Sequence, residues 1–409
     1  MSSVTQPQEA RSSFFTDLQR VLRQNIRQYG MFIALFAIWI FFTAATNGLF
    51  ISSRNISNLL NQTGYVAVLA VGVTLVIVIR HIDLSIGYLM GFLGALAAIA
   101  LKLWNLPVWV VIPAVLLFGT VLGAIPAFMI ANLGIPAFVA TLSGWLVYRG
   151  LLVVVLSATG TIIIEDQFFN AIGNGYIPDI VPPGSVVIAG APVHILTLIL
   201  GLAAIVLYIV SQINNRRKKL AYNFEVLPKE MFVLQLIFVA ILGVLATWVL
   251  AGYNGMSWTV VIMLIVVAIY SFMTTQMVLG RHIYAVGGNP EAAQLSGINV
   301  KRITYIVFCS MSMLAALAGI LFASRLRSAA PTAGAGFELD AIAAAFIGGV
   351  SAAGGVGSIV GSLIGALVYV SLTNGMNLMG TGSDAQNIVK GIVLAAAVIF
   401  DVATRRQAK

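Results

Sequence analysis

Charged residues are scarce in this sequence, and their scarcity excludes a soluble globular protein. Only 9% of the 409 residues are charged, whereas 60% are hydrophobic and the mean hydropathy is +1.01. A soluble domain carries roughly 25% charged residues, so there are too few here to cover a surface that faces water. Most of the exterior must therefore face lipid. The composition predicts an all-α polytopic membrane protein.

Cysteine and metal-binding patterns are missing as well. The single cysteine, Cys309, lies within an apolar stretch, which excludes a disulfide framework and a cysteine metal site. His81, His194 and His282 are scattered and have no metal-ligand spacing. No nucleophile and base are arranged as in an enzyme. We therefore expect no metal site, no catalytic residue and no enzymatic activity.

A phosphate-binding loop is also missing. The motif GxxxxGK[ST] does not occur, and the glycine run GGVGSIVG at 354–361 has neither a lysine nor a preceding strand pattern. The chain is therefore expected to bind no ATP and no other cofactor. The energy for any work must come from a partner or from an ion gradient.

About twelve apolar segments are long enough, or nearly so, to cross a bilayer. The segment at 339–350 is too short alone, so it either extends into its flanks or is a broken helix. No repeat of long period is visible, and we expect one transmembrane domain, 30–402, between tails at 1–29 and 403–409. The segments are 30–47, 62–79, 84–101, 107–131, 136–157, 190–211, 232–252, 258–279, 303–323, 339–350, 357–378 and 386–401.

The basic residues predict the orientation. The net charge of +9 could suggest nucleic acid, but the basic residues form short clusters between apolar spans, as the positive-inside rule requires, so no nucleic-acid partner is expected. The densest cluster, 214–219, marks a cytoplasmic loop. With twelve crossings, both termini and the polar segment 280–302 lie in the cytoplasm, and the acidic loop near 158–188 lies outside. Arg325 and Arg327 fall outside, against this trend.

Polar residues within or beside the spans are the candidates for a site, because each is costly in hydrocarbon. They either cap and brace helices or line a polar cavity, and the sequence leaves both interpretations open. Neutral amides near carboxylates suit an uncharged polyhydroxylated ligand. The candidates are Asp83 with the nearby Ser85, Glu338 and Asp340 after a glycine-rich turn, and Asn374 and Asn377, which share a helical face.

The segment 280–302, GRHIYAVGGNPEAAQLSGINVKR, resembles the cytoplasmic coupling segment of permease subunits in bacterial ABC sugar importers of the ribose, xylose and galactose class. The stretches at 54–87, 138–150 and 324–367 are similar to the same family. The chain has two more crossings than the shorter ribose-type members, an inserted pair at about 212–257, which places it near the xylose and multiple-monosaccharide permeases. It departs from the family at Arg80 and His81, whose role stays open.

The resemblance implies a permease in the bacterial inner membrane that moves a monosaccharide of the xylose, arabinose, glucose or galactose class. It also implies a homodimer, a cytoplasmic ABC ATPase that binds the ATP, and a periplasmic sugar-binding protein. The run 290–297 starts with proline and ends with glycine, as a short independent helix should. The alternative is a sugar transporter driven by an ion gradient. The residues expected to contact the ATPase are Arg281, Gly288, Asn289, Glu291, Ala292, Ala293 and Gly297.

Overall fold

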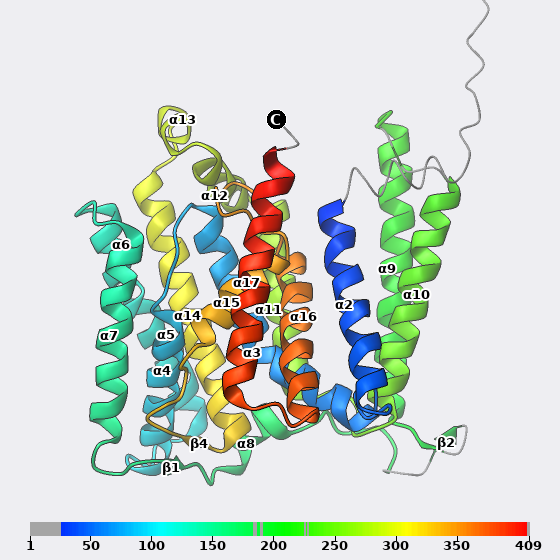
Figure 1. The fold of residues 1–409 in the computed structure, drawn as a ribbon, viewed down its shortest axis with the longest axis horizontal. Coiled ribbons are helices and arrows are strands. Elements are labelled where there is room, and N and C mark those ends of the chain that lie inside the picture. Colours follow the sequence, from blue (N-terminus) through cyan, green and yellow to red (C-terminus); the bar gives the residue numbers. More distant parts are fainter. Residues whose placement is uncertain (1–25, 183–185, 189–190, 225, 227–228, 407–409) are drawn as a thin grey trace, which may run out of the picture.

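The computed structural model describes residues 26–182, 186–188, 191–224, 226 and 229–406, and this part of the chain is a bundle of helices (Figure 1). Loops are joined by two small antiparallel pairs of strands. These are β1 (Ile162–Ile163) with β4 (Ser328–Ala329), and β2 (Val187–Ile188) with β3 (Ala191–Pro192). The helices are α2 (Ile26–Ala45), α3 (Ser53–Val78), α4 (Ile86–Lys102), α5 (Val108–Leu122), α6 (Ala124–Ala131), α7 (Ala137–Leu156), α8 (Gln167–Asn174), α9 (Ile195–Ala221), α10 (Lys229–Ala251), α11 (Trp258–Gln276), α12 (Val278–Gly288), α13 (Pro290–Leu295), α14 (Val300–Leu326), α15 (Phe337–Ile347), α16 (Ile359–Leu378) and α17 (Ser383–Arg406).

Every predicted apolar segment carries a helix, but the helices differ in length. Within the described residues, nine helices are long and apolar enough to cross a membrane, when α5 and α6 are taken as one. The apolar part of α2 and the whole of α4 are shorter. Helix α15 has 11 residues, which at 1.5 Å per residue covers only about half of a hydrocarbon layer roughly 30 Å thick. Of the two alternatives for 339–350, the structure has a short helix rather than a full crossing, and the count of twelve crossings stays a prediction.

The two ends of the bundle are distinct in Figure 1. Helices α12 and α13 and the end of α17 lie at one end, called here the α13 end and drawn at the top. The strand pair β1–β4 and helix α8 lie at the opposite end, called the β4 end.

Helices α3 and α14 run antiparallel through the centre of the bundle. The end of α3 is at the α13 end, where the carbonyl of Val78 accepts a hydrogen bond from Gly355 N (2.9 Å), and α14 begins there. At the β4 end, Arg325 near the end of α14 donates to the Asn58 side chain near the start of α3 (2.9 Å). Most of α3 is buried inside the protein, as is most of α14.

The elements that follow α3 and α14 form an inverted repeat. Each long helix is followed by an arginine with a positive φ angle, Arg80 (66°) and Arg327 (54°). A non-helical segment, a shorter helix (α4 or α15) and further long helices come next. Because α3 and α14 point in opposite directions, the two halves have inverted topology, as in many transporters. No such repeat is visible in the sequence.

The starts of α4 and α15 touch inside the bundle. A Cβ atom on Gly87 would overlap both the Gly334 carbonyl and the Glu338 carboxylate. Gly334 also has a positive φ of 86°, which disfavours any other residue there. Glycine at both positions therefore lets the two helix starts approach at backbone distance.

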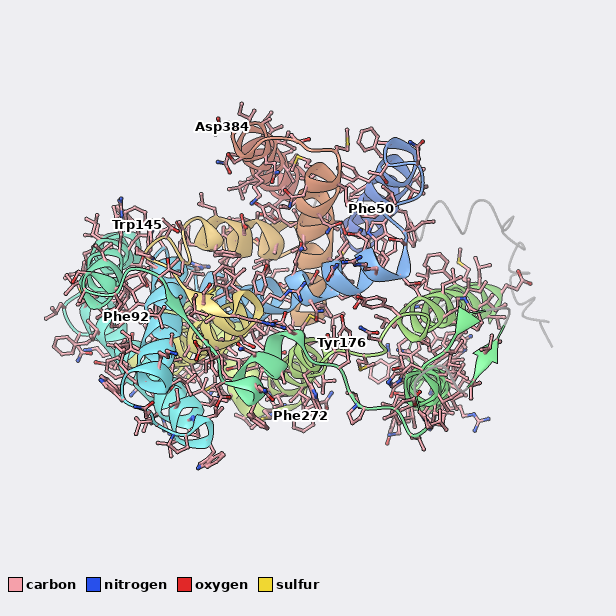
Figure 2. The ribbon with its side chains drawn as sticks, turned by 90° about the horizontal axis from the view of Figure 1, so that it is seen from below. Phe50, Phe92, Trp145, Tyr176, Phe272 and Asp384 are labelled. Carbon is pink, nitrogen blue, oxygen red and sulfur yellow. The ribbon has the colours of Figure 1, made fainter. Side chains whose placement is uncertain are left out.

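Helices α9 and α10 form a hairpin that stands beside the bundle. Viewed from the β4 end, the hairpin lies on one side of the molecule and Trp145 of α7 lies on the other (Figure 2). Few of its residues are buried inside the protein, in contrast to those of α3 and α14. Such apolar, uncovered helices fit a position in lipid.

Candidate functional site

A polar cavity of about 530 Å³ opens in the half of the bundle near the β4 end. It lies between α3, α16, α17, the end of α14 and the start of α15. Its volume is within the range of pockets that hold small molecules. The lining side chains are Gln62, Tyr65, Val66, Arg325, Leu326, Phe337, Asp340, Tyr369, Val370, Thr373, Asn377 and Lys390.

Three of the lining side chains form one polar cluster. Asp340 Oδ1 accepts a hydrogen bond from the Tyr369 hydroxyl at 2.7 Å. Lys390 Nζ lies 3.2 Å from each carboxylate oxygen and 5.3 Å from the centre of the Tyr369 ring. The pair is largely shielded, with 16% of the Asp340 side chain and 21% of the Lys390 side chain exposed. The carboxylate therefore has its charge compensated within the protein.

Arg325 places a positive charge at the edge of the cavity. Its guanidinium donates to the side-chain oxygens of Asn174 (3.0 Å) and Asn58 (2.9 Å). Beside it, the rings of Tyr65 and Phe337 are 5.6 Å apart in an edge-to-face arrangement. The cavity thus combines aromatic faces with hydrogen-bonding groups, which suits an uncharged ligand that carries several hydroxyl groups.

The two asparagines of α16 have different surroundings. Asn374 is buried, and its side-chain oxygen accepts a hydrogen bond from Asn55 Nδ2 at 2.9 Å. Asn377 is exposed, lines the cavity and accepts from Gln386 Nε2 at 2.7 Å. Asn377 therefore belongs to the cavity, whereas Asn374 ties α16 to α3.

Asp83 and Glu338 lie deeper in the bundle than the cavity residues and do not line it. Asp83 Oδ1 accepts from Ser85 N (2.9 Å) and Ser85 Oγ (2.6 Å) just before α4. Glu338 Oε1 accepts from Trp145 Nε1 at 3.0 Å. The second oxygen of each carboxylate is buried and has no hydrogen-bond partner among the described residues. Each of these residues lies at or just before the start of a short helix, and neither forms part of the cavity wall.

Sequence reasoning named Asp340 and Asn377 but missed the other charged residues of the cavity. Lys390 interrupts the apolar segment 386–401. Because a charge in hydrocarbon is costly, this lysine could have been recognised as a candidate site residue. Arg325 was seen only as an exception to the charge rule. The described residues contain no group of acidic, histidine and cysteine side chains that could hold a metal.

A second candidate site is the polar segment around α13. The Asn289 side chain caps the helix by accepting from the backbone N–H groups of Glu291 and Ala292, each at 3.0 Å. Gly297, with a φ of 85°, ends it. The residues of the segment 280–302 that are exposed to solvent are Arg281, Ala285, Gly288, Asn289, Glu291, Ala292, Gln294, Leu295, Ser296, Gly297, Asn299, Lys301 and Arg302.

Leu295 and Ala293 of α13 face in different directions. Leu295 is 91% exposed, whereas Ala293 is only 4% exposed and packs against its own chain. Leu295 therefore presents an apolar side chain on the surface of a capped helix of six residues. Ala293 holds the helix to the bundle instead.

The sequence of residues 55–398 matches the model of a family described as branched-chain amino acid transport system / permease component. A xylose transport system permease protein of Haemophilus influenzae is 39% identical over 94% of this chain and 98% of its own length. The corresponding protein of Escherichia coli K12 is 40% identical over 94% of this chain and 93% of its own.

A ribose import permease protein of Haemophilus influenzae is 36% identical over 90% of this chain and 91% of its own length. No solved structure matches the chain significantly. The family match covers most of the chain and agrees with its apolar helices, so the chain belongs to this family of membrane permease components of transport systems.

Proposed function

We propose that the chain is the membrane-spanning subunit of an ABC importer that moves a monosaccharide across the bacterial inner membrane, with xylose as the first candidate. Relatives that align over almost the whole chain are named as xylose and ribose permeases. The cavity supports the same class of cargo, because its size and its mixture of aromatic and hydrogen-bonding groups suit a neutral sugar.

The observation that carries the proposal is the exposed α13 helix. A permease without an ATP site needs a surface through which an ATPase can act on it. Helix α13 has a capped start, a glycine end and the exposed Leu295, and it projects from one end of the bundle (Figure 1). We place the ATPase on this surface.

The charges support a cytoplasmic position for the α13 end. The basic cluster at 216–219 ends α9, and Arg281 and Arg302 flank α13. The start of α2 and the end of α17 lie at the same end of the bundle as α13. On the positive-inside rule, we infer that both termini are cytoplasmic. The predicted tail at 1–29 lies mostly outside the described residues.

The β4 end would then face the periplasm and receive the sugar from a binding protein. The cavity opens in this half of the bundle, so it would serve as the outer part of the translocation pathway. A homodimer would place the cavities of two copies beside one axis. The binding protein would set much of the choice of sugar.

The test is transport by the purified permease, its ATPase and its binding protein in liposomes. We expect uptake of labelled xylose only when all three proteins and ATP on the ATPase side are present. An uncoupler that collapses ion gradients should leave the uptake unchanged. Uptake by the permease alone that stops with the uncoupler would instead establish an ion-coupled sugar transporter and refute the proposal.

A further inference from the structure

The side chain of Arg80 joins the end of α3 to the end of α12. Arg80 Nε donates to the Gly287 carbonyl at 2.6 Å, and Nη2 donates to the Gly288 carbonyl. Both carbonyls belong to the last turn of α12, where backbone acceptors have no partner within the helix and the helix dipole favours a positive charge. The guanidinium therefore caps the helix that leads directly into α13.

A third segment meets the other two at this place. Gly355, in the loop between α15 and α16, donates its N–H to the Val78 carbonyl at 2.9 Å. A Cβ atom on Gly287 would overlap both the Val78 carbonyl and Gly355 N. We call this set of contacts among Val78, Arg80, Gly287, Gly288 and Gly355 the Arg80 junction.

A second hydrogen bond ties α12 to the same loop. The Tyr284 hydroxyl donates to the Gly357 carbonyl at 2.7 Å. The close approach of backbones at the Arg80 junction and this additional bond leave little room for α12 to move independently. A displacement of α12 and α13 would be passed to both neighbouring segments.

The segments held by the Arg80 junction lead to the two short helices of the inverted repeat. Arg80 is the second residue of the non-helical stretch 79–85, which leads to the start of α4. The loop that contains Gly355 follows α15. Inside the bundle, the starts of α4 and α15 touch each other at Gly87 and Gly334. One chain of contacts therefore runs from the exposed α13 surface to the meeting point of α4 and α15.

The second half of the repeat shows that the turn itself does not need this clamp. Arg327 follows α14 as Arg80 follows α3 and has a similar φ angle. Arg327 is exposed. Among the described residues, its side chain makes no hydrogen bond or ion pair. An arginine can thus occupy this backbone conformation without binding carbonyls, so the contacts of the Arg80 side chain require another explanation.

We propose that Arg80 is a positioning residue that transmits the movement of α12 and α13 to the short helices α4 and α15. The inference rests on the proposed docking of an ATPase at α13. Arg80 acts through the Gly287 and Gly288 carbonyls and has no contact with cargo in this role. It gives a function to the arginine at which the chain departs from the pattern of the family it resembles.

The test compares Arg80→Gln, Arg80→Lys and the control Arg327→Gln in the reconstituted importer. Three quantities are measured: the amount of ATPase that copurifies with the permease, the basal rate of ATP hydrolysis, and the xylose taken up per ATP hydrolysed. Arg80→Gln should keep the first two and lower the third about tenfold, the effect of losing charge-assisted hydrogen bonds. Arg80→Lys keeps the charge and one carbonyl contact, so it should be intermediate, and Arg327→Gln should match the wild type.

Two results would overturn the inference. If Arg80→Gln transports as much xylose per ATP as the wild type, the side chain does not transmit movement. If both Arg80 variants lose ATPase binding or folded protein, Arg80 has a purely structural role. A wild-type permease that binds no ATPase would instead refute the proposed function, so the two failures are distinguishable.

Discussion

Lys390 of α17 and Asp340 of α15 form an ion pair, with the lysine nitrogen 3.2 Å from both carboxylate oxygens. The residues are 50 positions apart and meet at the wall of the polar cavity. Each charge would be costly without the other, because both side chains are largely shielded from water. The pair therefore joins α17 to the bundle and makes the cavity wall nearly neutral at this point.

Removal of one partner of this ion pair should destabilise the protein more than removal of both. Asp340→Asn or Lys390→Met alone should lower the free energy of unfolding by roughly 1–3 kcal/mol, less than for a fully buried pair because water partly screens this one. The double variant should regain part of the loss. Thermal unfolding of the four proteins in detergent, analysed as a double-mutant cycle, measures the coupling.

The exposed Asp384→Asn in the first turn of α17 serves as the control for this cycle and should leave the unfolding temperature almost unchanged. Strictly additive effects of Asp340→Asn and Lys390→Met would show that the pair contributes nothing. Xylose uptake by the double variant would separate bracing from a role in the pathway. If the pair only braces the helices, uptake should recover together with stability. If the charges act in the pathway, uptake should stay low.

Leu295→Glu should detach the ATPase while the permease stays folded. The side chain is 91% exposed, so the substitution removes no internal packing, but it places a charge in the proposed interface. Copurification of the ATPase should fall at least about tenfold, as for the loss of an apolar anchor. Leu133→Glu, in the exposed turn between α6 and α7, introduces the same charge elsewhere and should have no effect. Normal copurification with Leu295→Glu would contradict the position of the interface.

Ala293 and Gly297 are poorer choices for the same experiment. Ala293 packs against its own chain, and Gly297 has a positive φ angle that strains any other residue. Large side chains at these positions would disturb α13 itself. Loss of coupling in such variants would therefore not identify a contact with a partner.

The sequence was sufficient to locate the helices because apolar runs and their polar boundaries are local signals. The start of α13 is an example, since Asn289 and Pro290 form a recognisable helix start before any contact is known. The short helix α15 was also indicated, by a run too short to span a bilayer. The resemblance to a family supplied the expected role of α13 but not its geometry.

The relationships between distant segments could not be predicted in the same way. The inverted repeat pairs Arg80 with Arg327 through their backbone conformation, although the residues around them differ. The contacts of Arg80 with Gly287 and Gly288 join positions more than 200 residues apart. The meeting of Lys390 with Asp340 likewise depends on how α15 and α17 pack. Hydropathy and spacing carry no information about such contacts.

The loop at the β4 end should respond to acid through Asp179. Its carboxylate accepts hydrogen bonds from the N–H groups of Ile195 (2.9 Å), Leu196 (2.8 Å) and Ile180 (2.8 Å), and so caps the start of α9. Burial alone would raise the pKa of Asp179, but these hydrogen bonds and the nearby His194 outweigh it and lower the pKa. Because the folded-state pKa is below the unfolded value of about 4, the stabilisation is complete above that value and is lost as the pH falls through the folded pKa.

Hydrogen exchange of the amides of Ile195 and Leu196 between pH 6 and pH 3, about the range over which aspartates titrate, measures this effect. Protection in the wild type should decrease at the acidic end, after correction for intrinsic exchange. Asp179→Asn keeps an acceptor oxygen, so its protection should be nearly independent of pH. Asp179→Ala should lose about 1 kcal/mol of local stability near pH 6, and its difference from the wild type should shrink toward pH 3. A pH dependence that persists in Asp179→Asn would show that another group titrates.

Glu165 should contribute to docking of the sugar-binding protein at the β4 end. It precedes α8, in a segment that strand β1 fastens to β4, so the surface around it is ordered. The Glu165 side chain is 74% exposed, and its Oε2 lies 2.8 Å from Lys102 Nζ. The neighbouring Asp166 has a different role, because its Oδ1 accepts from Phe169 N at 2.7 Å and caps α8. A test of docking must therefore change Glu165 and keep Asp166.

Glu165→Lys reverses the exposed charge and places it beside Lys102, so the local surface becomes strongly positive. We expect slower association of the loaded binding protein, with an affinity lowered roughly three- to tenfold, as is typical for a charge near the edge of an interface. Binding to permease in nanodiscs at low and high salt measures this, and the difference should shrink at high salt because the charge is exposed. Asp166→Asn retains the helix cap and should bind almost as the wild type does. Equal association rates for Glu165→Lys and the wild type at low salt would place the docking surface elsewhere.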